Sequence, residues 1–191
     1  MPGKVLIIVG DGGESYETLY ANHRLKEDGF TPVVAAPSKR SLHLVIHDFE
    51  PGWDTYVERI GYRMDADITF AEVDVRDYMA VILIGGRSPE YLRNDPKVIS
   101  LVRAFDEAGK GLFALCHGVQ IVAAAGLAKG RRVTCYEHVR WEVVAGGGKY
   151  EDSESVRDGN LISARTWQDH PGFYREVMSW LRERSGSEAR K

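Results

Sequence analysis

The sequence predicts an α/β fold: a three-layer, doubly wound sandwich with a mainly parallel sheet and helices on both of its faces. Two observations carry this prediction. Short, continuously apolar runs rich in β-branched residues recur along the chain, as is typical of strands that are buried on both faces of a parallel sheet. Segments of helical length with an apolar stripe separate these runs, and parallel neighbouring strands require such crossover connections.

Four strands are predicted from the apolar runs and from the residues that bound them. The first run ends at Gly10, and the second is closed by Pro37, which cannot continue a paired strand. The third runs into a pair of glycines, and the fourth leads directly to Cys116. The predicted strands are residues 4–9, 31–36, 79–84 and 111–115.

Capping residues and glycines mark the predicted helices. Asp95 suits the N-cap and Pro96 the first helical position, so a helix is expected to begin there. An Ala-rich helix follows Cys116, and a closing amphipathic helix starts at residues 169–171. A further helix is expected directly after the turn at residues 11–15. Glycine often ends a helix because it readily adopts a left-handed conformation. The helix after residue 15, the helix from residue 95 and the helix after Cys116 are therefore expected to end before Gly29, Gly109 and Gly126.

The chain of 191 residues has the length of one domain with a single core. We predict one α/β domain with flavodoxin-like layering over residues 1–185, followed by a polar C-terminal tail over residues 186–191. Residues 41–70 interrupt the alternation of strands and helices. They are expected to form a hairpin or an excursion from the main sheet that carries subunit contacts or selects the substrate.

Composition argues against several classes of function. The formal net charge of −3 gives no support for a nucleic-acid partner, and the longest apolar run is far shorter than the ~20 residues that span a membrane. No secretory signal is expected. The two cysteines, Cys116 and Cys135, are not at metal-site spacing, so no disulfide scaffold is expected and a reducing cytoplasm is the expected location.

No cofactor and no metal ion are expected. The glycine-rich turn at residues 10–13 invites comparison with a dinucleotide motif, but Ser15 stands at the third glycine position and Glu14 would direct a carboxylate toward the pyrophosphate. His43 and His47 are four residues apart, but a metal site would need further ligands.

Polar turns after three of the predicted strands point to a functional site. These turns cover residues 10–15, 85–90 and 116–118. Ligands of open α/β sheets bind outside the carboxyl ends of the strands. If the strands are neighbours, Glu14 and Glu90 converge with Cys116 and His117 on one site.

Cys116 is the strongest candidate for a nucleophile. A thiol at a tight turn between a buried strand and a helix resembles a nucleophile elbow, where unpaired backbone N–H groups favour a thiolate and can bind an oxyanion. We predict that His117 carries a proton and that Glu14 is the carboxyl partner of the sulfur or a general acid/base. The alternative is a buried cysteine that packs as a small apolar side chain, which is what we expect of Cys135. The expected substrate and oxyanion contacts are Gly85, Gly86 and Val119.

Three groups of residues resemble the PfpI family of intracellular proteases and deglycases, which belongs to the class I glutamine-amidotransferase-like superfamily and includes the Parkinsonism-associated deglycase. The matching segments are residues 116–121 with 123–126 and 129–131, residues 85–92, and residues 23–26. Further motifs resemble the glyoxalase III branch of the family, namely residues 10–17, 47–50, 146–148 and 170–171. On this resemblance, His47 is expected to be structural or to lie at the rim of the pocket.

The resemblance implies a cysteine-dependent enzyme with Cys116 as nucleophile, its sulfur hydrogen-bonded to a protonated Glu14, and His117 beside it. Glu90 would be a further carboxylate, which in protease-like members approaches across a subunit interface, so a homo-oligomer (a dimer or larger) is expected. The reactions implied are glutathione-independent conversion of methylglyoxal or glyoxal to the hydroxy acid, deglycation of glyoxal adducts, and peptide hydrolysis.

Two alternatives stay open beside an enzyme of small reactive carbonyls. A PfpI-like cysteine peptidase would need His117 oriented by a third group. A non-catalytic stress protein could use the same cysteine as a redox sensor that oxidises reversibly to the sulfenic acid.

Overall fold

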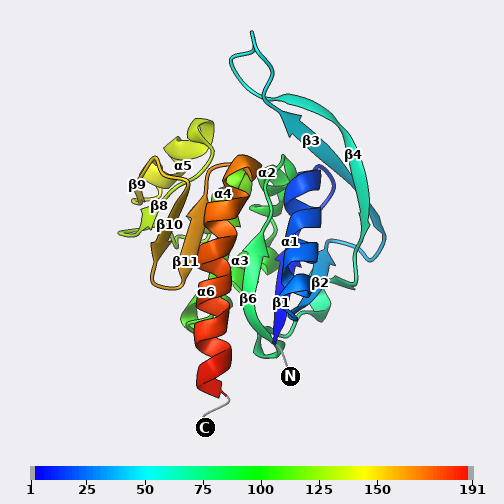
Figure 1. Ribbon diagram of the computed structural model, residues 1–191, viewed down its shortest axis with the longest axis vertical. Coiled ribbons are helices and arrows are strands. Elements are labelled where there is room, and N and C mark those ends of the chain that lie inside the picture. The colour runs from blue at the N-terminus through cyan, green and yellow to red at the C-terminus, as the bar shows by residue number, and fades with distance from the viewer. Residues whose placement is uncertain (1–2, 189–191) are drawn as a thin grey trace.

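A seven-stranded sheet between two layers of helices forms the body of the protein (Figure 1). The computed structural model describes the backbone of residues 3–188. The strand order is β10-β11-β7-β6-β1-β2-β5, and all neighbours are parallel except β10 and β11. The strands are β1 (Lys4–Ile8), β2 (Thr31–Ala36), β5 (Ile68–Thr69), β6 (Tyr78–Leu83), β7 (Gly111–Leu115), β10 (Ser155–Asp158) and β11 (Leu161–Ala164).

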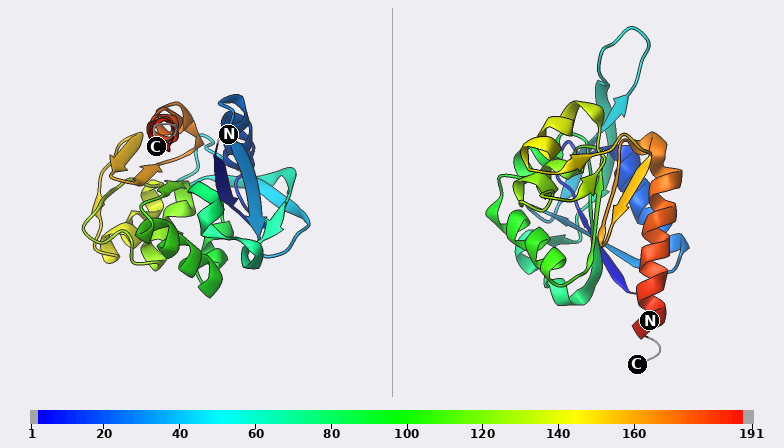
Figure 2. Two further views of the ribbon diagram at one scale, coloured as in Figure 1. Left: turned by 90° about the horizontal axis from the view of Figure 1, so that it is seen from below. Right: turned by 90° about the vertical axis from the view of Figure 1, so that its left-hand side faces the viewer.

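Helices cover both faces of this sheet (Figure 2). One face carries α1 (Ser15–Glu27) and α6 (His170–Glu188), and the other carries α3 (Pro96–Glu107) and α4 (Val119–Ala124). Two short helices, α2 (Ser88–Leu92) and α5 (Arg140–Ala145), pack on α4. Single 3₁₀ turns are η1 (Phe70–Glu72), η2 (Val75–Asp77), η3 (Cys116–Gly118), η4 (Glu137–Val139) and η5 (Trp167–Asp169). The predicted three-layer, doubly wound α/β sandwich is confirmed.

The central strands explain why the apolar runs identified the fold. Every residue of β7, and Val5 to Ile8 of β1, is buried, because helices cover the sheet on both sides. The predicted cap of α3 is also confirmed, since the Asp95 side chain accepts a hydrogen bond from the N–H of Lys97 at 2.8 Å. None of the helices within the described backbone is long and apolar enough to cross a membrane.

Residues 41–70 contain the expected hairpin. It pairs β3 (Ser41–Asp48) with β4 (Val57–Asp65) in antiparallel register and projects beyond the carboxyl edge of the main sheet (Figure 1). Two backbone hydrogen bonds attach β3 to the loop after β1, from Gly12 N–H to His43 O and from Val45 N–H to Gly13 O. The hairpin therefore brings residues from the middle of β3 to the end of the sheet where the site was expected.

The C-terminal half differs most from the sequence expectation. The sequence pattern predicted no elements for β8 (Arg132–Val133), β9 (Lys149–Tyr150), α5, β10 and β11, which have two to six residues each. Segments this short contain too little periodicity to be recognised. The predicted tail is helical where it is described, because α6 continues through residues 186–188, and residues 189–191 lie outside the described part of the chain.

Candidate active site

Cys116 occupies a nucleophile elbow between β7 and α4. Its φ of 58° makes it the only non-glycine residue in the described part of the chain with a left-handed backbone, a conformation that costs free energy and recurs at functional sites. The turn is tight enough to require Gly118, since a Cβ there would lie 2.2 Å from the carbonyl oxygen of Leu83. The predicted elbow is therefore present at the carboxyl edge of the sheet.

The carboxyl partner of the sulfur is Glu17, and the assignment of Glu14 to this contact was wrong. The fully buried Glu17 carboxyl lies beside the Cys116 side chain, where each group influences the pKa of the other, and its Oε1 has no hydrogen-bond partner among the described residues. Its Oε2 also accepts a hydrogen bond from the N–H of Gly85 at 2.7 Å. Glu14 instead caps α1, where its Oε2 accepts from the N–H of Glu17 at 2.6 Å.

The physical reason for this correction is helix geometry. An acidic residue at the N-cap folds back onto the first turn of its own helix, so Glu14 cannot also reach the thiol. Glu17 stands one turn further along α1, on the face that meets the sheet. The spacing of two glutamates three residues apart at a helix start, a variant of the capping box, was the signal that could have identified Glu17.

Burial favours the protonated form of both Cys116 and Glu17. Burial is the main reason why the pKa of Glu17 is raised well above its ordinary value, and the nearby Glu14 adds to this rise. Burial and the Glu17 carboxylate also raise the pKa of the Cys116 thiol. The expectation that the elbow alone favours a thiolate is thus corrected, and a base has to take the thiol proton during attack.

His117 is placed to be that base. Its Nδ1 lies 3.2 Å from the sulfur of Cys116, and its side chain is buried. Burial, assisted by the neighbouring His47, lowers the pKa of His117 to about 4, so the ring is neutral near pH 7 and can accept a proton. Aromatic rings surround it, with Tyr136 at 5.2 Å and Tyr56 at 5.6 Å between ring centroids.

Only one of the three expected oxyanion contacts has a free backbone donor. The N–H of Gly85 is bonded to Glu17, and the N–H of Val119 is directed to the carbonyl oxygen of His117, so these two assignments are corrected. In the described residues no hydrogen bond engages the N–H of Gly86, which lies in the loop between β6 and α2 with a φ of 71°.

Glu90 is not joined to the nucleophile within one chain. It is exposed on α2, and none of the hydrogen bonds found among the described residues connects its carboxylate to Cys116 or His117. Its negative charge still contributes to the raised pKa of Tyr56, of which burial is the larger cause. The role of Glu90 remains a prediction. Cys135 is fully buried, as expected of a packed residue, and burial raises its pKa to about 12.

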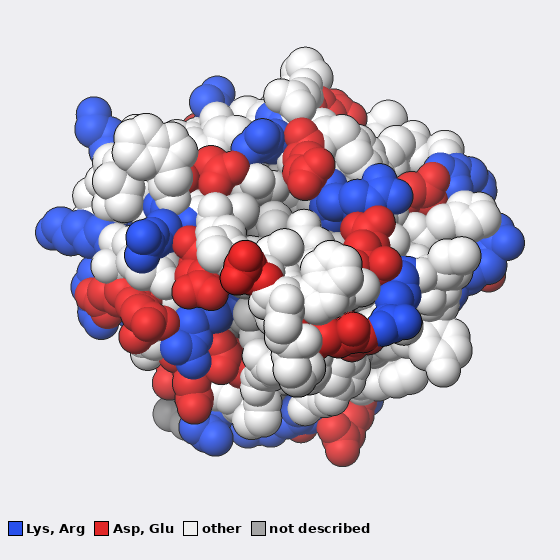
Figure 3. Space-filling model, turned by 90° about the horizontal axis from the view of Figure 1, so that it is seen from above, with Lys and Arg blue, Asp and Glu red and all other residues white. Residues whose placement is uncertain are grey.

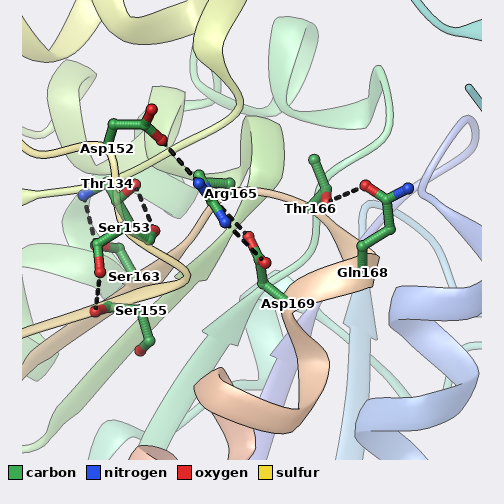
Figure 4. Close-up of polar contacts among 9 residues, drawn as sticks. All are labelled: Thr134, Asp152, Ser153, Ser155, Ser163, Arg165, Thr166, Gln168 and Asp169. Carbon is green, nitrogen blue, oxygen red and sulfur yellow. Dashed lines mark hydrogen bonds and ion pairs between the residues drawn. The ribbon is translucent and has the colours of Figure 1, made fainter.

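A cavity of about 280 Å³ lies next to the ring of Tyr136. Its polar wall is built around Arg165, which donates to Asp169 at 2.8 and 3.1 Å and to Asp152 at 2.8 Å (Figure 4). Phe49 and Tyr136 form its aromatic wall. Because both partners of Arg165 are carboxylates, the cation is already neutralised, and the cavity offers mixed polar and aromatic contacts rather than a strong anion site.

The surface around the carboxyl edge carries both signs of charge. Acidic and basic side chains are interspersed in the view onto this end of the molecule, with uncharged surface between them (Figure 3). Among residues 3–188, no group of three or more His, Cys, Asp or Glu side chains is placed to hold a metal ion. The titratable groups gathered at the site include the Cys116 thiol, the buried Glu17 carboxyl and the His117 imidazole.

Comparison with known proteins places this site in a family. Residues 3–180 match the model of the DJ-1/PfpI family. The chain belongs to the DJ-1/PfpI family. It is 38% identical over 185 residues to Protein DJ-1 homolog D of Arabidopsis thaliana, covering 93% of this chain and 47% of that protein. It is 37% identical over 180 residues to Deglycase TK1284 of Thermococcus kodakarensis, covering 94% and 96% of the two chains.

Solved structures with similar coordinates show the same fold. A ThiJ/PfpI domain protein from Brachyspira murdochii superposes with a TM-score of 0.84 at 20% identity, covering 96% of this chain and 98% of that one. The chain spans about half the length of the Arabidopsis DJ-1/PfpI relative and nearly the whole length of the Thermococcus one. The family recognised from the cysteine and glycine motifs of the sequence is thus confirmed.

Proposed function

We propose that this DJ-1/PfpI protein is a deglycase that acts through Cys116 on adducts of glyoxal and methylglyoxal, and that it also converts the free dicarbonyls to hydroxy acids without glutathione. The observation that carries the proposal is the Cys116 thiol at the elbow, 3.2 Å from Nδ1 of His117 and beside the buried Glu17 carboxyl, whose pKa burial raises. The names of deglycase relatives support the same class of reaction.

Both reactions pass through one intermediate. The sulfur of Cys116 forms a bond to the aldehyde carbon, and the thiol proton passes by way of His117 to the carbonyl oxygen, which gives a hemithioacetal. With an adduct of an amine, the new C–S bond replaces the C–N bond, and the amine leaves with the proton. A site that makes this hemithioacetal therefore serves free and amine-bound dicarbonyls alike.

Glu17 supplies the following proton transfer. Its carboxyl gives a proton to the neighbouring carbonyl oxygen and accepts the proton from the carbon that carries sulfur. Return of that proton to the second carbon, with loss of the hydroxyl proton of the first carbon to Glu17, leaves the second carbon reduced to an alcohol and the first oxidised to a thioester. Water then cleaves the C–S bond, which releases the hydroxy acid and restores the thiol.

Two features of the site make a cysteine peptidase and a redox sensor less favourable than a deglycase. A peptidase triad needs a group that orients the histidine, but within the described chain the His117 ring is hydrogen-bonded only to the sulfur of Cys116. A redox sensor needs an accessible, low-pKa thiol, but Cys116 is only 5% exposed and burial raises its pKa.

Assembly of several copies is part of the same proposal. Large apolar side chains are exposed on β4 and α5, notably Ile60, Tyr62 and Trp141. Such residues are favourable at contacts between subunits, and a partner copy could bring Glu90 to a neighbouring site. Measuring the mass of the protein in solution tests this part independently of activity.

Turnover by four substitution variants tests the function. We expect Cys116→Ala to abolish both methylglyoxal consumption and release of free amine from a methylglyoxal adduct of N-acetyl-lysine. Glu17→Gln should lower both rates about 100-fold or more, because it removes a general acid/base, whereas Glu14→Gln should lower them far less. Cys135→Ala, which removes the other buried thiol, is the matched control and should retain activity. Activity that survives Cys116→Ala would disprove the proposal.

A further inference from the structure

We propose that His47, oriented by Glu58, is a second base at this site and takes a proton from the water that hydrolyses the Cys116 thioester. This inference rests on the proposed function and assigns a residue to its last step. The sequence had suggested only a structural or rim position for His47.

A hydrogen-bonded relay fixes the protonation of the His47 ring. Nε2 of His47 lies 2.9 Å from Oε2 of Glu58, which faces it across the β3–β4 hairpin. The other oxygen of Glu58 accepts from Nε of Arg87 at 2.9 Å. Although burial opposes it, these two bonds hold the pKa of Glu58 below its ordinary value. A charged carboxylate only accepts hydrogen bonds, so Nε2 carries the proton and Nδ1 carries the lone pair.

The lone pair on Nδ1 of His47 accepts no hydrogen bond from the described part of the chain. Nδ1 of His47 is buried and has no hydrogen-bond partner among the described residues, in a side chain that is 3% exposed. An unpaired buried acceptor lowers the stability of the folded protein, so its retention calls for an explanation. Burial lowers the pKa of His47 despite the nearby Glu58, so the ring is neutral and able to accept a proton.

The surrounding contacts hold the ring next to Tyr56 and His117. It stacks on Tyr56 at 3.8 Å and meets the ring of His117 edge-on at 6.0 Å. Its backbone is fixed on both sides, because its carbonyl oxygen accepts from Nε1 of Trp167 at 2.9 Å and its N–H donates to Glu14. The ring is thus oriented by a carboxylate and immobilised by packing, as in known acid–base relays.

The reaction has a use for a base other than His117. Nδ1 of His117 faces the sulfur, so this histidine is placed to return a proton to the sulfur when the thioester breaks. The attacking water needs an acceptor elsewhere. As the new C–O bond forms, the water proton moves to Nδ1 of His47, and the C–S bond breaks to leave the Cys116 thiolate. The proton on His47 then passes through solvent to the neutral His117 ring and from Nδ1 of His117 to the sulfur, which restores the thiol and both rings.

Two substitutions separate this role from a structural one. His47→Phe keeps a flat ring against Tyr56 but has no nitrogen, and His47→Asn keeps a polar atom near the position of Nδ1 but cannot take a proton. Each variant is mixed with methylglyoxal and quenched at intervals, and the covalent adduct on Cys116 is measured by mass spectrometry. Turnover is measured separately. After free methylglyoxal is removed by gel filtration, loss of the accumulated adduct is measured with and without hydroxylamine, a nucleophile that cleaves thioesters without help from a base.

We expect both variants to form the adduct at nearly the rate of the native protein and then to accumulate it. Their kcat should fall about 100-fold, the size of a general-base contribution, and hydroxylamine should release most of the accumulated adduct. His43→Phe, an exposed histidine on the same strand, is the matched control and should behave as the native protein does. Glu58→Gln should also accumulate the adduct, and it provides the test if the His47 variants fail to fold.

The outcomes against the inference are distinct from those against the proposed function. If the variants turn over normally, or if adduct formation slows as much as turnover, His47 is not the base for hydrolysis. Failure of hydroxylamine to release the accumulated adduct would overturn the inference as well. If the native protein forms no adduct on Cys116, the proposed function itself fails.

Discussion

Replacement of Glu14 by Gln should change the stability of the protein in opposite directions at low and at high pH. The Glu14 carboxyl is 1% exposed, and burial raises its pKa from an ordinary value of 4.5 to about 7. Below pH 4.5 the carboxyl is neutral in both the folded and the unfolded chain, so it has no effect through ionisation. Between pH 4.5 and 7 the unfolded chain loses the proton while the folded chain keeps it, which lowers the stability of the folded state.

The size of this effect follows from the same values. The difference between 4.5 and about 7, at 1.36 kcal/mol per pH unit, amounts to roughly 3 kcal/mol above pH 7. Gln keeps an acceptor for the N–H of Glu17 but not for that of His47, whose bond to Glu14 is long at 3.5 Å, so about 1 kcal/mol is lost at every pH. We expect Glu14→Gln to be less stable than the native chain by about 1 kcal/mol at pH 4 and more stable by about 2 kcal/mol at pH 8.

Urea unfolding between pH 4 and pH 8, at one fixed protein concentration, measures this difference. The variant and the native chain share every other titrating group, so their difference in unfolding free energy isolates position 14 and the groups it influences. Glu72→Gln is a useful control, because that carboxylate is exposed on η1 and its pKa is lowered rather than raised by bonds to Thr69. A difference for Glu14→Gln that is the same at both pH values would refute the reasoning.

Substitutions at three further positions test the fold by their effect on thermal or urea unfolding. Gly118→Ala should destabilise the protein by about 1–3 kcal/mol and reduce turnover, because its Cβ would lie 2.2 Å from the carbonyl oxygen of Leu83; an unchanged midpoint would contradict this. Asp95→Ala should lower stability by about 1 kcal/mol through loss of the α3 cap, while Asp95→Asn should largely preserve it. Gly186→Ala should raise stability by about 0.5–1 kcal/mol, since it lies in α6 with nothing within 4 Å of the added carbon; destabilisation there would argue against the helix.

The central sheet and the nucleophile were predictable because their signals are local. A strand buried on both faces must be apolar at every position, so the runs that became β1, β6 and β7 could be recognised without knowledge of their partners. Cys116 was identifiable because a strand, a tight turn and a helix follow one another directly. The same local character made the cap of α3 and the C-terminal ends of α1 and α3 visible.

The rest of the site depends on contacts between distant segments. His47 and Glu58 become partners only because β3 and β4 pair in one particular register, and Arg87 joins them from the loop before α2. Glu17 was missed for a more local reason, since Glu14 was closer to the strand end and the capping geometry that withdraws it was not considered. Strand β11 pairs with β7 in the sheet, but its four residues are too few to display a period.

The hairpin of residues 41–65 makes the active site modular. The thiol, its carboxyl partner and His117 come from the body of the fold, whereas His47 and Glu58 are contributed by an element that the main sheet does not contain. Exchange of this hairpin for that of a relative would alter the second histidine and its carboxylate while leaving the elbow sequence untouched. A chimaera built in this way could reassign the final step of the reaction without redesign of the nucleophile.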